Sequence, residues 1–160
     1  MIGLYTFIEQ GCRIGENVFI GNSVTIRTGT TIGDNCKIGH NTTIESNCFI
    51  GNNCSIQANC YIPSGVVIDD WVFIGPSVTG SNDKRIWYGR SAKIIPHENK
   101  GYVIKRGTRI GAGVCILPVV IGRNVLVGAG SVVTKDVSDG TIVVGNPATY
   151  IGEVPIAEHI

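Results

Sequence analysis

The sequence has few of the features that would place a protein in a membrane or on nucleic acid. No stretch approaches the roughly 18 apolar residues that a membrane-spanning helix needs, although 43% of the 160 residues are apolar. The first residues, Met1 to Tyr5, show neither the basic segment nor the long apolar run of a signal peptide. The net charge of +1 gives no general attraction to nucleic acid or to an anionic membrane. We therefore expect a cytoplasmic protein with one domain and a substantial core.

Charged residues are scarce and unevenly distributed. Residues 1–83 contain three basic and seven acidic side chains, whereas residues 84–160 contain ten basic and five acidic ones. The two parts thus have formal charges of −4 and +5, and we expect anionic ligands to bind to the second part. Seven of the thirteen basic residues lie close together: Lys84, Arg85, Arg90, Lys93, Lys100, Lys105 and Arg106.

A repeat of six residues dominates the first half of the chain. Isoleucine occurs at every sixth position from Ile2 to Ile74 without a substitution. Four residues after each isoleucine stands a small or β-branched residue, such as Thr6, Cys12 or Val18. We expect both columns to face inward, with the residue between Cys12 and the next isoleucine facing outward by strand alternation.

The third residue after each isoleucine indicates how the chain turns. From position 11 to 77 this column contains Gly, Asn and Ser, which tolerate left-handed backbone angles, with Trp71 as the single bulky exception. Three hexads then form a triangular coil of 18 residues, and coils stack about 4.8 Å apart as parallel strands. The sequence therefore predicts an all-β fold, a parallel β-helix of hexapeptide repeats.

The repeat is interrupted once. It stops at Gly80, resumes at Ile104 and is one residue short after Ile116. An interruption of this length inside a compact domain is usually functional or disordered. We predict a single domain (1–160) with N-terminal coils (1–79), one excursion loop (80–103), C-terminal coils (104–137) and an irregular C-terminal tail (138–160).

Cysteine and histidine do not indicate a metal site. Five cysteines occupy the inward column, where Val and Thr stand elsewhere: Cys12, Cys36, Cys48, Cys54 and Cys60. A free thiol acts there as a small apolar residue, so we expect neither a disulfide nor a bound metal, whereas Cys115 falls at an outward position. The three histidines, His40, His97 and His159, are widely separated in the repeat. Of these, His97 lies in the excursion.

The whole chain resembles the hexapeptide-repeat acyltransferases, and most closely the sugar N-acetyltransferases that modify nucleotide-linked amino sugars. The resemblance rests on residues 72–78, 82–83, 104–107, 110–113, 127–137 and 144–148. The run Gly-Ala-Gly-Ser-Val-Val-Thr-Lys-Asp-Val at 128–137, followed by Gly-Asn-Pro-Ala at 145–148, is the part more specific for acyl-CoA users. The resemblance implies that the β-helix is left-handed.

The resemblance also implies a reaction. It is acetyl-CoA-dependent N-acetylation of an amino sugar, free or nucleotide-linked, by a homotrimer with active sites between subunits. In these sugar N-acetyltransferases Thr-Asn-Asp is commonly followed by Pro-Arg, whereas this chain has Ser81-Asn82-Asp83 and Gly89-Arg90. The particular sugar is thereby left open.

The implied catalytic residues are Asn82, which would orient the amine, and His97, which would act as general base. A protein base is not required in such enzymes, because the departing thiolate can take the proton. Asp83 and Arg90 would bind the sugar substrate, and Trp71 could stack on a sugar or a base or pack beneath the excursion. The cofactor residues are Gly111, Ala112, Gly128, Ala129, Lys135 and Pro147. The small ones among them would let backbone N–H groups approach a thioester.

Two other readings remain open. An O-acetyltransferase acting on a sugar hydroxyl would use the same fold and the same acetyl donor. A β-helix that resembles γ-class carbonic anhydrases, or a non-catalytic scaffold, would need no acetyl-CoA at all. Three metal-binding histidines would favour the carbonic anhydrase, but His40 and His159 lie far from the excursion in the sequence.

Overall fold

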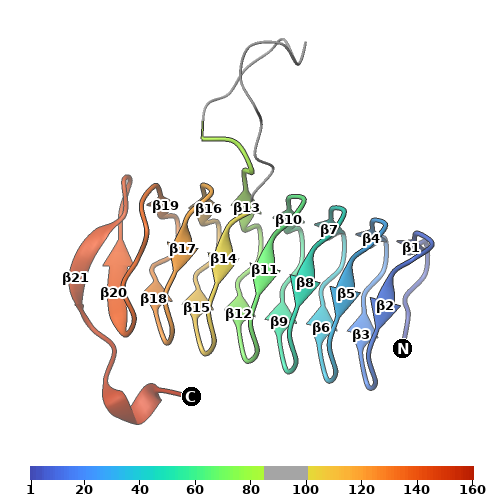
Figure 1. Ribbon diagram of the computed structural model, residues 1–160, viewed down its shortest axis with the longest axis horizontal. Helices are drawn as coiled ribbons and strands as arrows, with labels where there is room; N and C mark the ends of the chain where they lie inside the picture. Colours follow the sequence, from blue (N-terminus) through green and yellow to red (C-terminus); the bar gives the residue numbers. More distant parts are fainter. Residues whose placement is uncertain (85–100) are drawn as a thin grey trace.

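The computed structural model describes residues 1–84 and 101–160, which form one elongated triangular prism of stacked coils (Figure 1). The described residues contain 21 strands and one 3₁₀ helix, η1 (Ile156–Glu158), and the strands form three sheets. Most strands are only two residues long, because the chain turns to a new face every six residues. The all-β fold predicted from the repeat is confirmed, and the stacking agrees with a left-handed β-helix.

The three faces of the prism are sheets of seven, six and eight strands, all parallel except for the last strand of the eight-stranded sheet. The seven-stranded sheet contains β1 (Phe7–Ile8), β4 (Thr25–Ile26), β7 (Thr43–Ile44), β10 (Tyr61–Ile62), β13 (Thr79–Gly80), β16 (Cys115–Ile116) and β19 (Val132–Val133). The six-stranded sheet contains β2 (Arg13–Ile14), β5 (Thr31–Ile32), β8 (Phe49–Ile50), β11 (Val67–Ile68), β14 (Val103–Ile104) and β17 (Val120–Ile121). The eight-stranded sheet contains β3 (Phe19–Ile20), β6 (Lys37–Ile38), β9 (Ser55–Ile56), β12 (Phe73–Ile74), β15 (Arg109–Ile110), β18 (Leu126–Val127), β20 (Thr141–Val144) and β21 (Thr149–Glu153).

The register of the strands follows the repeat. Phe7 pairs with Thr25, one coil of 18 residues further along. Val67 pairs with Val103, two coil lengths away, so the excursion adds one coil's worth of residues without disturbing the stack. Cys115 pairs with Val132, one residue closer than a full coil, as the shortened hexad predicted.

The interior is built from the two predicted columns. The isoleucines from Ile20 to Ile74 are essentially inaccessible to solvent, and so are most of the Val, Cys and Thr residues four positions later. The second column also makes hydrogen bonds that the sequence analysis missed. Thr30 Oγ1 donates to Glu45 O at 2.8 Å and Cys48 Sγ donates to Pro63 O at 3.2 Å. Thr and Cys therefore both suit this column, because both are small and both can donate to a neighbouring turn.

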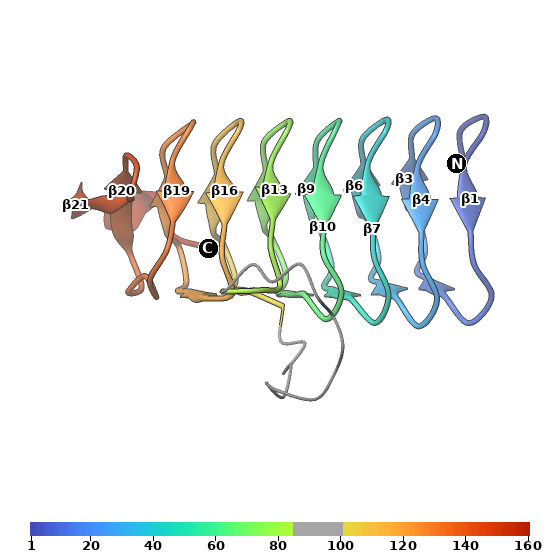
Figure 2. The same ribbon diagram turned by 90° about the horizontal axis from the view of Figure 1, so that it is seen from above.

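Each edge of the prism is a column of three-residue turns, and we name the three edges as corners. The first corner, between the eight- and seven-stranded sheets, contains turns 21–23, 39–41, 57–59, 75–77, 111–113 and 128–130. The second corner contains turns 9–11, 27–29, 45–47, 63–65 and 134–136, and the excursion leaves from it (Figure 2). The third corner contains turns 15–17, 33–35, 51–53, 69–71, 105–107 and 122–124.

The last residue of each turn has the predicted left-handed conformation. Asn17, Trp71 and Gly113 are examples, with φ of 55°, 61° and 66°. Trp71 is not the only bulky residue in this column, because Tyr5 has φ 59°. A large side chain at such a turn is thus tolerated twice, and it does not by itself indicate a ligand.

The tail is more regular than expected. β20 continues the eight-stranded sheet beside β18, and β21 then pairs with β20 in the antiparallel direction. η1 returns toward the coils, where Glu158 bonds Arg109 at 2.7 Å. In the part of the chain that the structure describes, no helix has the length and apolarity to span a membrane.

Candidate functional site

The third corner shows how these turns are normally closed. The backbone N–H of Glu16 donates to Asp34 Oδ1 at 2.7 Å, and that of Asp34 donates to Asn52 Oδ1 at 2.8 Å. Asn52 N–H donates in the same way to Asp70 Oδ1 at 2.7 Å, and Arg123 N–H to Asp139 Oδ1 at 2.7 Å. The middle residue of one turn therefore provides the acceptor for the turn before it. We call this arrangement the side-chain ladder.

The first corner begins with the same ladder and then loses it. Leu4 N–H donates to Asn22 Oδ1 at 3.0 Å, and Asn22 N–H donates to His40 Nδ1 at 2.8 Å. His40 therefore has its ring proton on Nε2. From the next coil onward, the middle residues of the turns have no side chain that can accept a bond: Ala58, Pro76, Ala112 and Ala129.

In the part of the C-terminal coils that the structure describes, the loss of the ladder leaves two backbone donors of the first corner without partners; the third corner has one such gap there, at the Arg106 N–H. Within the described residues, the N–H groups of Ala112 and Ala129 have no acceptor, and both residues are exposed. Gly111 and Gly128 differ from them, because their N–H groups donate to Val127 O and Val143 O, both at 2.8 Å. The four small residues predicted to bind the cofactor thus divide into two with free N–H donors and two whose N–H groups hold the coils together.

Gly111 has a separate reason to be glycine. A Cβ built on it would lie 2.5 Å from Ala129 N, closer than real Cβ contacts allow. The absence of a side chain at position 111 lets the two coils stack this closely, as Gly39 and Gly75 do at earlier turns of the corner. The sequence signal was the Gly-Ala-Gly motif itself, but only the hydrogen bonds reveal which amides are available.

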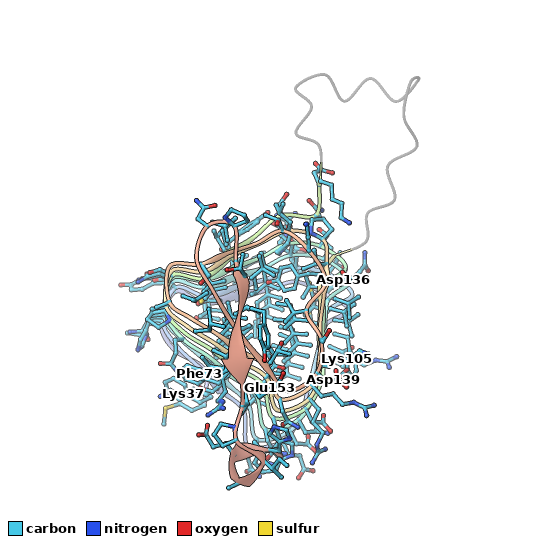
Figure 3. All side chains as sticks on the ribbon, turned by 90° about the vertical axis from the view of Figure 1, so that its left-hand side faces the viewer. Lys37, Phe73, Lys105, Asp136, Asp139 and Glu153 are labelled. Carbon is cyan, nitrogen blue, oxygen red and sulfur yellow. The ribbon has the colours of Figure 1, made fainter. Side chains whose placement is uncertain are left out.

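A shallow groove of about 300 Å³ lies beside the two free donors. It is lined by Phe73, Arg109, Ile110, Gly111, Leu126, Val127, Gly128 and Ala129. Phe73, Arg109 and Leu126 are outward residues of adjacent strands in the eight-stranded sheet. Phe73 and Asp136 lie on opposite sides of the prism in Figure 3, so the groove faces away from the second corner. Sequence reasoning did not identify Phe73, Arg109 or Leu126 as site residues.

The predicted catalytic residue Asn82 lies at the second corner, in a short ordered turn. Ser81 N–H donates to Ile116 O at 2.9 Å, which ties the turn to β16. Asp83 N–H donates to Ser81 Oγ at 3.0 Å, and the same hydroxyl donates to Asp83 O at 3.0 Å. Asn82 is half-buried between these anchors. His97 and Arg90 lie outside the described residues.

The first and second corners are the two margins of the seven-stranded sheet (Figure 2). Ala112 precedes β16, and Ser81 lies beside Ile116 at the other end of that strand. Four residues of extended chain separate Ala112 from Ile116, a span of roughly 13 Å. A single subunit therefore does not bring the Ala112 N–H and Asn82 to the same reacting atom.

The other predicted site residues are dispersed. Trp71 is at the third corner, and its N–H donates to Asn52 O at 2.9 Å. Lys135 is exposed at the second corner, next to β19. Pro147 lies in a turn that packs beside β19, where Val132 N–H donates to Gly145 O at 2.9 Å. Of the predicted cofactor residues, Lys135 is thus the one at the opposite margin of the sheet from Ala129.

The described histidines are also dispersed. His40 belongs to the first corner, whereas the ring of His159, in the tail, lies 3.2 Å from Val154 O. In residues 1–84 and 101–160, no group of three His, Cys, Asp or Glu side chains is arranged to hold a metal ion. Cys36, Cys48, Cys54 and Cys60 are buried as predicted, whereas Cys12 and Cys115 are half-buried.

Comparison with models of known protein families shows to which family the chain belongs. Residues 11–46 and 47–79 match the bacterial transferase hexapeptide model, and residues 103–135 match the model for the hexapeptide repeat of succinyl-transferase. Together these matches span more than half of the chain. The protein belongs to the hexapeptide-repeat transferase family.

Individual relatives give a more varied picture. The chain is 36% identical over 83 residues to a galactoside O-acetyltransferase of Lactococcus lactis, covering 51% of this chain and 40% of that protein. It is 45% identical over 53 residues to a dTDP-3-amino-3,6-dideoxy-α-D-galactopyranose 3-N-acetyltransferase of Aneurinibacillus thermoaerophilus, covering 32% and 28%. The chain thus spans well under two thirds of the curated relatives it matches.

A solved structure agrees over a longer stretch. A hexapeptide-repeat acetyltransferase of Vibrio cholerae, complexed with acetyl coenzyme A, superimposes with a TM-score of 0.65 and 26% identity. The superposition covers 79% of this chain and 72% of that one.

Proposed function

We propose that the protein is an acetyl-CoA-dependent N-acetyltransferase that acts in the cytoplasm on an amino sugar, which is nucleotide-linked. The observation that carries this proposal is the pair of free N–H donors at Ala112 and Ala129, beside a groove in the C-terminal coils. The family, and relatives named as acetyltransferases of sugars, support the same reaction class.

The free donors suit the pantetheine arm of the acetyl donor. Stacked coils place the Ala112 and Ala129 N–H groups about 4.8 Å apart and roughly parallel. An extended arm with amide and thioester carbonyls can accept from both donors in turn. Phe73 and Leu126 would then offer apolar contact in the groove, while Pro147 would flank the adenine and Lys135 would meet the phosphates. Lys135 reaches this ligand from the neighbouring subunit, because it lies at the opposite margin of its own sheet.

The acceptor amine requires the second corner. Asn82 would orient the amine and Asp83 would bind sugar hydroxyls or the ammonium. Arg90 and the basic residues around it would bind the phosphates of the nucleotide. Because one subunit separates Ala112 from Asn82 by roughly 13 Å, the complete site needs the second corner of one subunit beside the first corner of another. A homotrimer would bring these two corners together at each of its three subunit interfaces. Acetyltransferase activity in a monomeric protein would contradict this arrangement.

The reaction is then an acyl transfer. The amine nitrogen attacks the thioester carbon, the carbonyl oxygen becomes an oxyanion that N–H donors stabilise, and the C–S bond breaks. The proton lost by the amine passes either to His97 or to the departing CoA thiolate. No step needs a metal.

A sugar O-acetyltransferase is the second candidate, favoured by the similarity to the galactoside O-acetyltransferase. It differs only in the acceptor atom. Release of CoA thiol with a panel of amino sugars, their nucleotide conjugates and the matching hydroxy sugars distinguishes the two activities. N-acetylation predicts turnover that disappears when the amine is replaced by a hydroxyl.

The experiment that tests the cofactor site rebuilds the side-chain ladder. In Ala129→Asn, the new amide oxygen is expected to accept from Ala112 N–H, as Asn52 accepts from Asp34 N–H at 2.8 Å. The variant should keep its thermal stability, but calorimetry should show acetyl-CoA binding weakened by about tenfold to a hundredfold.

The matched control is Ala58→Asn, which places the same amide in the same corner, three coils earlier. It would accept from His40 N–H and should leave acetyl-CoA affinity unchanged. Wild-type affinity in Ala129→Asn, or an equal loss in Ala58→Asn, would refute the assignment of the first corner.

A further inference from the structure

The hexapeptide pattern is broken at both ends of the excursion, and the two breaks face each other. Position 80 belongs to the isoleucine column but is glycine, and position 102 belongs to the small-residue column but is tyrosine. The coil before has Ile62 with Val66 at these places, and the coil after has Ile116 with Val119. Gly80 is therefore smaller than the usual residue of its column, and Tyr102 is larger than the usual residue of its own.

The two residues fill a single space. A Cβ built on Gly80 would lie 2.2 Å from Tyr102 Cε1 and 3.0 Å from Pro63 Cδ. The φ angle of Gly80 is not in the left-handed region, so this residue is glycine for lack of room and not for its backbone conformation. The Tyr102 ring is fully buried and occupies the place that an isoleucine side chain takes in the other coils.

Core stability alone does not account for tyrosine at position 102. Within the described chain its hydroxyl is buried without a hydrogen-bond partner, and burial raises the pKa of the phenol. An unpartnered buried hydroxyl is destabilising, and the Ile–Val pair of the neighbouring coils would avoid it. The ring therefore stands at a position where the pair of the neighbouring coils would leave no polar side-chain atom without a partner.

The ring connects the two ends of the excursion to the turn that holds Asn82. Gly80 is the last residue of β13, and the next residue, Ser81, donates its N–H to Ile116 O at 2.9 Å. Tyr102 is the residue before β14, and its carbonyl accepts from Val67 N–H at 3.1 Å. The path from β13 into Ser81, Asn82 and Asp83 thus starts against one edge of the ring.

We propose that Gly80 and Tyr102 form a positioning pair that sets where the turn Ser81–Asp83 leaves β13. The pair rests on the proposed function, because its purpose is to place Asn82 for the acceptor amine. Neither residue touches substrate. A shift of about 1 Å in a group that orients a substrate can cost roughly 10²-fold in rate, so a rigid base for this turn has catalytic value.

The test restores the ordinary repeat. Gly80→Ile alone should clash with the ring, and Tyr102→Val alone should leave a cavity, so both single variants should lower the melting temperature. The double variant Gly80→Ile/Tyr102→Val should recover most of that stability, because it reproduces the Ile62–Val66 pair of the coil before. It should nevertheless lower kcat at least tenfold with the amino sugar, and leave KM for acetyl-CoA unchanged.

A second readout does not depend on activity. Hydrogen exchange should show faster exchange of the Ser81 and Asp83 amides in the double variant, with β15 and β18 as protected as in the wild type. Wild-type kcat together with wild-type protection of these two amides would overturn the proposal. If the wild-type protein acetylates no amino sugar but the protection changes as described, the proposed function fails and the positioning pair stands.

A second set of variants covers the case in which the double variant does not fold. Tyr102→Phe keeps the ring and should retain full kcat with a higher melting temperature. Tyr102→Leu removes the ring and should lower kcat without changing KM for acetyl-CoA. Equal kcat in these two variants would overturn the proposal.

Discussion

The first and third corners have the same backbone and differ in one respect. In the third corner, side chains such as Asp34 and Asn52 accept a hydrogen bond from the middle N–H of the turn one coil before. In the first corner the ladder stops at His40, and alanine or proline follows. The fold thus forms with either kind of residue at the middle position of the turn. In the described C-terminal coils the third corner also keeps a free donor, the Arg106 N–H, but the groove adjoins the free donors of the first corner.

The same comparison shows what the first corner cannot provide. Its turns from position 57 onward contain no titratable side chain, so under the proposed function this corner would bind and polarise the acetyl group but would provide no group to remove a proton. The chemistry must be completed by the second corner and the excursion, or by the leaving thiolate.

The largest expected effect tests whether the second corner and the excursion provide the proton acceptor that the first corner lacks. If His97 is the general base, His97→Ala should lower kcat by roughly 10²- to 10⁴-fold, with the loss following one ionisation in the imidazole range. If the thiolate takes the proton, His97→Ala should change little, and Asn82→Ala should lower kcat more because the amine is misplaced. Both are measured at saturating acetyl-CoA. Near-wild-type turnover in both variants would remove the second corner from the active site.

The fold could be predicted from the sequence because one period governs it. The two inward columns and the left-handed third position each repeat often enough to fix the coil, the register and the shortened hexad after Ile116. The candidate site was harder to predict, because its main feature is a pair of backbone N–H groups that have no hydrogen-bond partner among the described residues. That Ala112 and Ala129 keep free N–H groups, whereas Gly111 and Gly128 do not, depends on hydrogen bonds between coils that leave no mark on composition.

Other parts of the site were missed for a related reason. Phe73, Arg109 and Leu126 are ordinary outward residues of separate hexads, and only the stacking of β12, β15 and β18 brings them to one groove. Conversely, Trp71 stood out in the sequence but lies at the third corner, away from Asn82 in its own subunit.

A smaller effect is expected from breaking the ladder where it is intact. Asp34→Ala removes the acceptor of Glu16 N–H at an exposed turn, where water can replace it. We expect a loss of about 1 kcal/mol, or a melting temperature lower by about 2–4 °C. Asp34→Asn should cost less, because Asn52 makes the same bond one coil later. Reduced acetyl-CoA turnover in Asp34→Ala would mean that the two corners are not functionally distinct.

The effect that is smallest at neutral pH, and that grows only in alkaline solution, concerns the interior that both corners share. Burial is the main cause that raises the pKa of Cys48 and of Cys60, and both thiols donate to backbone carbonyls. Because the pKa of these thiols is raised in the folded state, they stabilise the fold fully at pH values below the pKa of an unfolded thiol, about 8.5. This stabilisation is lost as the pH rises above that value, because the unfolded chain gains more from releasing the proton. Above that pH, each thiol can lower the free energy of unfolding by up to about 1.4 kcal/mol per pH unit.

Threonine provides the matched variant for this prediction. Thr30 and Thr42 occupy the same columns one coil before Cys48 and Cys60, and they donate to the equivalent carbonyls at 2.8 and 3.0 Å. Cys48→Thr/Cys60→Thr should therefore keep the hydrogen bonds and lose the thiol titration. Urea midpoints measured from pH 7 to 10 should fall less steeply in this double variant than in the wild type. Equal slopes, or rapid labelling of the buried thiols in the native protein, would show that these cysteines are not enclosed in the core.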